Sequence, residues 1–245
     1  VNMQEASNES KDLVSSYVPE VQIATSIEKN ILYAMFEMRA FNYTLDTSFY
    51  DKAAKYFEAL HSDIKNAEDL AKTSAILKDL KEQSKDAGTA LSEYEKMARE
   101  TSQANEQIIV LRKKYTEAGD KMTAASNEVL KSQESKLLAE IGSKGIGTEK
   151  LKERYQKLAI VTKVLDLIVD VQANNLKSQA YRDAKFVNVS MSKFPEIEAL
   201  LKKLGTMIHD PKDLENFKII SENAARYKEC LEEARKIRDT LDKLG

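Results

Sequence analysis

A row of polar side chains occupies positions where a buried helix seam should be apolar. Within the segment 148–190, Leu165 and Ile168 start a spacing of three and four residues that is typical of a helix packed in a bundle. The continuation of this spacing is polar and falls on Gln172, Asn175, Gln179 and Arg182, here called the polar row. Because each buried polar group without a partner costs roughly 1–3 kcal/mol, the polar row predicts a partner that satisfies it.

The C-terminal segment supplies side chains that complement the polar row. Asn223 and Tyr227 lie four residues apart on one face of a predicted helix, and Arg226 lies beside them. The Arg182 guanidinium can bind an anionic group, and amide and phenol groups can orient a small ligand through hydrogen bonds. We therefore predict a ligand site formed by the polar row together with Asn223, Tyr227 and Arg226.

A structural explanation of the polar row stays open. If the helix is rotated about its axis, Leu176, Ala180 and Phe186 face the interior and the polar row meets solvent. In that arrangement the polar row needs no ligand.

The first third of the chain contains a weaker equivalent of this site. Arg39, Asn30 and Tyr94 are its candidate ligand-binding residues. The surrounding seam of Ile27 and Ile31 is otherwise apolar, so a structural role is favoured for this second site.

No other group of residues in the sequence indicates chemistry. His61 and His209 are far apart and lack the spacing to carboxylates that metal sites show. The glycine-rich segment 142–148 lacks the lysine that a phosphate-binding loop places before Thr148. Nothing in the sequence places a nucleophile beside a base. The sequence therefore predicts no catalytic residue, no metal ion, no cofactor and no enzymatic activity.

The composition of the 245 residues predicts an all-α fold. Seven Gly, three Pro and no Trp are present, and Ala, Glu, Lys and Leu are abundant. The net charge of −2 gives no electrostatic basis for binding nucleic acid. Cys230 is the single cysteine, so the sequence has no internal disulfide. No apolar run approaches the roughly 18 residues that a membrane span needs.

About six helices position the candidate residues. Their expected ranges are 19–46, 47–69, 73–141, 148–190, 195–204 and 211–244, behind a leading segment 1–18. Pro19 and Pro195 suit first helical turns, and Thr47, Ser48 and Thr148 are candidate caps. The helices 73–141 and 148–190 form a long antiparallel hairpin, unless a turn near 101–105 divides the first of them. Within 73–141, residues three and four positions apart, from Ile108 and Leu111 to Val129, predict its buried seam.

The chain contains a doubled pattern on either side of this hairpin. The first copy contains Arg39, Leu60, Lys78-Asp79-Leu80 and Tyr94. The second copy contains Arg182, Leu200, Lys212-Asp213-Leu214 and Tyr227. We interpret 20–100 as a first helical repeat, 101–165 as a shared hairpin and 166–245 as a second repeat. Chance similarity stays an alternative, because such short motifs are common in helical proteins.

This layout resembles the helical bimodular sensor domains of bacterial methyl-accepting chemotaxis receptors and related sensor kinases. The resemblance covers most of residues 20–240 as architecture and rests on no signature sequence; only Arg39 and Arg182 lie at plausible motif positions. It implies two stacked up-down helical bundles that share long helices. It also implies a periplasmic dimer between two membrane spans that binds small ligands.

We therefore expect an extracytoplasmic sensor domain of a chemotaxis receptor that signals by a small helix displacement. The expected ligand is an amino acid, an amine or a small organic acid. The chain begins at Val1 without an initiator Met, and we expect segments outside it to anchor the parent protein in the membrane. The alternatives are the sensor domain of a membrane histidine kinase and a purely structural helical spacer or coiled-coil partner.

Overall fold

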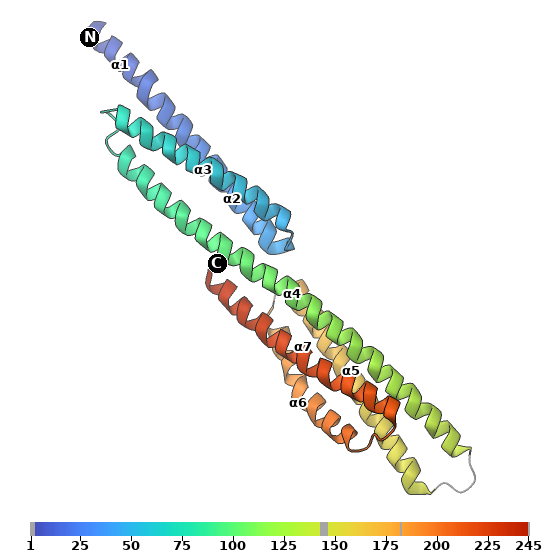
Figure 1. Cartoon of the computed structure of the whole chain (residues 1–245). Helices are drawn as coiled ribbons and strands as arrows, with labels where there is room; N and C mark the ends of the chain where they lie inside the picture. Colours follow the sequence, from blue (N-terminus) through green and yellow to red (C-terminus); the bar gives the residue numbers. More distant parts are fainter. Residues whose placement is uncertain (1–2, 143–146, 182, 245) are drawn as a thin grey trace. The chain divides into compact units, whose positions relative to one another are not determined.

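The computed structural model describes residues 3–142, 147–181 and 183–244. These ranges contain helices joined by short connections and no strand, so the all-α prediction is confirmed (Figure 1). The helices are α1 (Met3–Asp12), the π-helix η1 (Leu13–Tyr17), α2 (Val18–Thr44), α3 (Thr47–Thr73), α4 (Leu80–Ile141), α5 (Thr148–Tyr181), α6 (Lys185–Gly205) and α7 (Pro211–Leu244).

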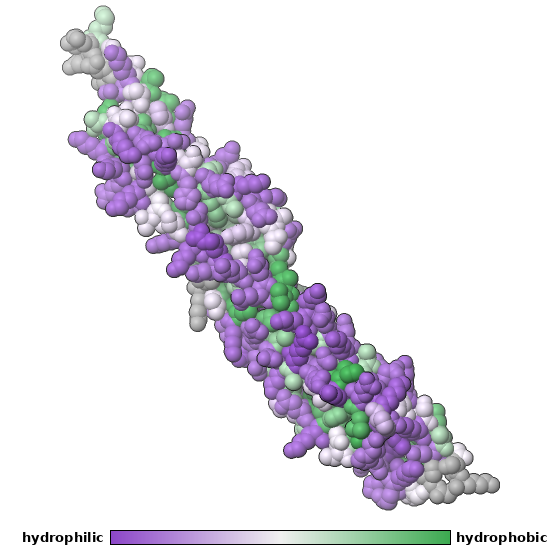
Figure 2. Space-filling view, in the orientation of Figure 1, coloured by the Kyte–Doolittle hydropathy of each residue, from purple (hydrophilic) through white to green (hydrophobic). Residues whose placement is uncertain are grey.

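The chain divides into two compact units. Unit 1 comprises Val1–Glu106 with Leu244–Gly245, and unit 2 comprises Gln107–Lys243. Helix α4 contributes residues to both units, whereas α5 and α6 belong wholly to unit 2. The boundary therefore falls after Glu106, and the predicted shared hairpin 101–165 lies almost entirely within unit 2. Figure 2 shows that the side of each unit in view is mostly hydrophilic, with hydrophobic side chains gathered in small patches.

Unit 1 is built around the apolar face of α2. Ala34, Met38 and Phe41 are buried there and pack with Phe57 and Leu60 of α3. Asp46 caps α3, because its carboxylate accepts a hydrogen bond from the Ser48 backbone N–H at 2.9 Å. The cap residue is thus Asp46 and not the predicted Thr47 or Ser48.

Unit 2 is a bundle of four helices that includes the second part of α4. The predicted seam of α4 is buried, and it includes Leu111, Tyr115, Met122 and Val129. The other three helices complete one core with Ile168 of α5, Phe194, Ile197 and Leu204 of α6, and Ile220 and Leu231 of α7. The alternation of three and four residues therefore identified the buried face of α4 correctly.

The prediction for residues 181–204 was wrong. Helix α5 ends at Tyr181 instead of continuing to about Ser190, and α6 begins at Lys185. The Asp183 carboxylate accepts a hydrogen bond from the Lys185 backbone N–H at 2.9 Å, which favours a helix start there. Pro195 lies inside α6, on its exposed side. Proline has no backbone N–H to donate to the carbonyl one turn earlier, and water can bind that carbonyl instead.

Two other boundaries differ from the predicted ones. Helix α3 extends to Thr73, and α4 begins at Leu80 and runs on to Ile141 without the turn considered near 101–105. The described part of the leading segment, residues 3–18, is helical and widens into the π-helix η1 just before Pro19. A π turn is a common response to a residue that disturbs the hydrogen-bond ladder. Helix α5 begins at the predicted Thr148, and residues 143–146 of the predicted loop lie outside the described residues.

The doubled pattern occupies similar places in the two units. Lys78-Asp79-Leu80 lies at the start of α4, and Lys212-Asp213-Leu214 lies in the first turn of α7. The closing tyrosines also correspond. The ring of Tyr94 lies 5.8 Å from that of Phe57, and the ring of Tyr227 lies 6.3 Å from that of Phe194. In each unit the closing tyrosine therefore lies beside a phenylalanine of the preceding helix, α3 in unit 1 and α6 in unit 2.

Candidate functional site

The described residues of the polar row, Gln172, Asn175 and Gln179, face the interior of unit 2. Asn175 is buried, and Gln172 and Gln179 are partly buried, whereas Leu176 is 65 % exposed and Ala180 is exposed. The rotated arrangement, in which the polar row meets solvent, is therefore not the one observed. Arg182, the fourth member of the row, lies outside the described residues.

Tyrosine hydroxyl groups satisfy two amides of the polar row. Asn175 Nδ2 donates a hydrogen bond to the hydroxyl oxygen of Tyr227 of α7 at 3.1 Å. Gln179 Nε2 donates to the hydroxyl oxygen of Tyr115 of α4 at 2.9 Å. The two phenol rings are 5.5 Å apart, and burial raises the pKa of both tyrosines. Both phenols are therefore neutral at physiological pH and remain hydrogen-bonding groups.

The Gln172 amide has room in the bundle because α4 carries glycine opposite it. A Cβ atom on Gly119 would overlap Gln172 Nε2 and lie 3.1 Å from the Tyr227 ring. Gly119 therefore lets a polar side chain and an aromatic ring approach the α4 backbone closely.

The remaining predicted residues of the site do not join this group. Asn223 Nδ2 donates to the backbone carbonyl of Ile219 in its own helix at 2.8 Å, and Arg226 is exposed. The structure thus brings together three members of the polar row and Tyr227, and it adds Tyr115. Tyr115 lies in the α4 seam among apolar residues. Its hydroxyl group was the signal that could have identified it as a hydrogen-bond partner of the polar row.

Replacing Tyr227 by phenylalanine is expected to lower the free energy of unfolding by about 1–3 kcal/mol, because the buried Asn175 amide loses its acceptor. Urea denaturation followed by circular dichroism measures this change. The matched control is Tyr155→Phe in α5, whose side chain is exposed and whose substitution should change the free energy by less than about 0.5 kcal/mol. Equal effects of the two variants would contradict a structural role for the Asn175–Tyr227 hydrogen bond.

The weaker predicted site in unit 1 is also satisfied within the protein. Asn30 Nδ2 donates to Asp63 Oδ2 at 2.9 Å and to Ser26 Oγ at 3.3 Å. Tyr94 is half-buried against Phe57, and burial raises the pKa of its phenol. Arg39 is exposed on α2. These contacts do not require a ligand. They agree with the structural role that the sequence favoured for this second site.

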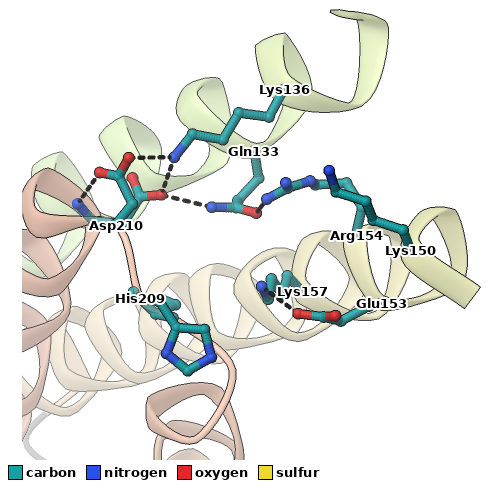
Figure 3. A pocket seen from close by; sticks show the side chains of 10 residues that line it. Gln133, Lys136, Lys150, Glu153, Arg154, Lys157, His209 and Asp210 are labelled. Carbon is teal, nitrogen blue, oxygen red and sulfur yellow. Dashed lines mark hydrogen bonds and ion pairs between the residues drawn. The ribbon is translucent and has the colours of Figure 1, made fainter. Parts of the chain in front are cut away.

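A polar pocket of about 310 Å³ lies elsewhere in unit 2, and the sequence did not predict it (Figure 3). It is formed by the end of α4, the beginning of α5 and the turn from α6 into α7. Its lining residues are Gln133, Lys136, Lys150, Glu153, Arg154, Lys157, Ile208, His209, Asp210 and Asp213.

Asp213 is the most buried charged residue of the pocket. Its side chain is fully buried, and Oδ2 accepts hydrogen bonds from Gln133 Nε2 at 2.6 Å and Lys136 Nζ at 2.7 Å. The second oxygen, Oδ1, is buried without a hydrogen-bond partner. Asp210 caps α7 by accepting from the backbone N–H groups of Lys212 and Asp213, which fixes the position of Asp213 in the first helical turn.

Gln133 connects Asp213 to a second ion pair. Its Oε1 accepts a hydrogen bond from Arg154 Nη1 at 2.5 Å. Arg154 also donates to both carboxylate oxygens of Glu140, through Nε at 3.1 Å and Nη2 at 2.7 Å. This bidentate pairing holds the pKa of Glu140 below its usual value. The result is a continuous polar chain from α7 through α4 to α5.

Two lysines add positive charge around this series of hydrogen-bonded side chains. Lys157 is buried, and its Nζ lies 2.6 Å from Glu153 Oε1. Burial disfavours the charged form of Lys136, but its bonds to Asp213 and Asp210 outweigh that effect and raise its pKa. Among the described residues, none of those that line the pocket is a serine, a threonine or a cysteine. The pocket is therefore suited to holding a small polar molecule through charged and hydrogen-bonding groups.

Sequence reasoning had signals that could have found this pocket. Gln133 follows the apolar seam residue Val129 by four positions and is 2 % exposed. Lys157 likewise lies one turn before the buried Val161 of α5. Both are polar residues on buried faces, as in the polar row. The turn that carries His209 and Asp210 gave no such signal.

No protein-family model, curated protein or solved structure matches this chain. Among the described residues, no three His, Cys, Asp or Glu side chains are grouped as the ligands of a metal ion would be. None of the helices in the described ranges combines the length and hydrophobicity that crossing a membrane requires.

Proposed function

We propose that the chain is the extracytoplasmic ligand-binding domain of a membrane receptor of the chemotaxis type. In this proposal unit 2 binds a small polar metabolite between its helices. The observation that supports it most is the pocket that contains the fully buried Asp213 carboxylate, with one oxygen lacking a partner. The resemblance to helical bimodular sensor domains supports the receptor class, the periplasmic location and a homodimer.

The energetics of the pocket favour binding over a purely structural role. Desolvating charged groups costs several kcal/mol per ion, and apolar residues of similar volume often stabilise a protein at least as well as a buried ion pair. The core of unit 2 already contains a large apolar cluster. Burying Asp213 and Lys157, and partly burying Arg154, beside it therefore adds little to stability, whereas these groups can orient a polar ligand.

The pocket lies where a ligand can act on helix positions. Its lining residues come from α4, α5 and α7, so one ligand contacts three helices. A ligand shifts a conformational equilibrium when it binds one arrangement of these helices more tightly than another. Small helix shifts are a known form of such switching. In this proposal the displacement of these helices carries the signal toward the membrane anchors.

A structural helical spacer is the second candidate function, and the polar row favours it. Asn175 and Gln179 find their partners in Tyr227 and Tyr115, so these amides need no ligand. A spacer of this kind would keep the same contacts in all conditions and would respond to no small molecule.

A thermal-shift screen of the whole chain against amino acids, amines and small organic acids tests the proposal. A ligand at 100 times its dissociation constant stabilises the native state by about 2.7 kcal/mol, so a binding metabolite should raise the melting temperature clearly. The variants Lys157→Met and Arg182→Ala then distinguish the pocket from the polar row, since only the variant in the true site abolishes the shift. The absence of any shift across the screen would favour the spacer.

A further inference from the structure

The pocket has two ends of opposite chemistry. At one end, the carboxylate of Asp213 keeps a buried Oδ1 that accepts no hydrogen bond. At the other end, the buried Lys157 ammonium is bonded to Glu153, and an ammonium has three N–H donors. Nearby, Lys150 is exposed and lies 3.7 Å from its nearest carboxylate oxygen, on Glu140. In Figure 3 Lys150 and Lys157 of α5 lie on a different side of the pocket from Asp210, which precedes α7.

The charges around the pocket balance. Four cationic side chains line it, namely Lys136, Lys150, Arg154 and Lys157. Four carboxylates accompany them, of which Glu153, Asp210 and Asp213 line the pocket and Glu140 pairs with Arg154. A ligand with a large net charge of either sign therefore gains little net attraction. A ligand that carries one positive and one negative group can use both ends.

We propose that the pocket binds a small α-amino acid as the zwitterion. The inference rests on the proposed function and names its ligand class. The ligand ammonium donates to Asp213 Oδ1, after a small adjustment that opens this oxygen to the pocket, and thereby supplies its missing partner. The ligand carboxylate accepts from Lys157 and Lys150. Ile208 and His209, from the turn before α7, contact the ligand side chain.

The size of the pocket limits the ligand. A volume of about 310 Å³ lies at the lower end of the roughly 300–1,000 Å³ that small-molecule sites occupy. A free amino acid suits this volume better than a peptide or a nucleotide. Ile208, which is buried, offers apolar contact at the pocket wall. We therefore expect the preferred amino acid to have a compact side chain.

Isothermal titration calorimetry with the whole chain tests the ligand class. Each of the common L-amino acids is titrated, and the best is compared with its N-acetyl derivative and its methyl ester. Acetylation removes the positive charge and esterification removes the negative charge. Each change is expected to weaken binding at least tenfold. Binding of either derivative with unchanged affinity would overturn the proposal, and so would the failure of every amino acid to bind.

Two variants locate the binding. Lys157→Met and Asp213→Asn are each expected to weaken amino-acid binding at least tenfold, whereas Lys163→Met, at an exposed position of α5, leaves it unchanged. If Asp213→Asn does not fold, Lys157→Met alone decides, because Glu153 is half exposed and tolerates the loss of its partner. Unchanged binding in Lys157→Met would show that the site lies elsewhere and would refute the proposal.

The outcomes separate this inference from the proposed function. If an organic acid or an amine binds, no amino acid does and Lys157→Met abolishes that binding, then the function stands and the zwitterion proposal is wrong. If none of the tested metabolites binds, both proposals fail together.

Discussion

Replacing Asp213 by asparagine is expected to lower the free energy of unfolding by about 3 kcal/mol, because the fully buried side chain loses the charge that strengthens both of its hydrogen bonds. The carboxylate is fully buried and accepts hydrogen bonds from Lys136 and Gln133. Asparagine has nearly the same shape but carries no charge for the lysine. It also presents an NH₂ group to donors if its amide is turned the wrong way. Urea denaturation of the whole chain measures the loss.

The control for this prediction is Asp166→Asn in α5, at an exposed position of the same unit. It should change the free energy by less than about 0.5 kcal/mol. The single variant Lys136→Met and the double variant with Asp213→Asn complete a double-mutant cycle, which measures the coupling of the pair separately from the desolvation of each group. A loss below about 1 kcal/mol for Asp213→Asn would contradict a buried, hydrogen-bonded Asp213 carboxylate.

Replacing Phe41 by alanine is expected to lower the free energy of unfolding by about 3–5 kcal/mol, because it removes a fully buried ring and leaves a cavity. Phe41 packs in the core of unit 1, and its ring lies 5.7 Å from that of Tyr50. The same substitution at Phe36, five residues earlier in α2, provides a matched control. The side chain of Phe36 is 65 % exposed, so Phe36→Ala should cost less than about 0.5 kcal/mol.

This pair of variants tests the orientation of α2 directly. Both remove the same atoms from the same helix and change its intrinsic helix propensity equally. The difference between their denaturation midpoints therefore reports burial alone. Similar losses for both variants would mean that α2 does not present the seam of Ala34, Met38 and Phe41 to α3.

The proposed site changes what the doubled pattern means. Both copies place a Lys-Asp-Leu motif at the start of a helix, but only Asp213 is buried in a polar pocket. Unit 1 uses its polar groups Asn30 and Asp63 to join neighbouring helices. The two units are therefore unequal, as the sequence suggested. The units differ in the polar pocket, which lies at the start of α7 and the end of α4. The polar row lies in another part of unit 2.

Local sequence determined most of the secondary structure of this protein. The alternation of three and four residues identified the buried faces of α2 and α4, because helix periodicity brings those residues to one side. Helix α7 begins at Pro211, as in its expected range 211–244, and a first-turn proline needs no hydrogen-bond donor. The same rule failed at Pro195. The hydrogen bond from the Lys185 backbone N–H to the Asp183 carboxylate favours an earlier start of α6, and the exposed side of the helix tolerates the proline.

Tertiary structure alone decided how the buried polar groups are satisfied. The sequence showed that the polar row needs partners, but Asn175 and Tyr227 are 52 residues apart and Gln179 and Tyr115 are 64 apart. Periodicity assigns a face to each helix and does not state which faces meet. The pocket depends on the same kind of information, since Gln133 and Asp213 are separated by 80 residues. The spacing of residues along one helix therefore predicted that polar groups are buried. Only the packing of α4, α5 and α7 determined which groups they pair with.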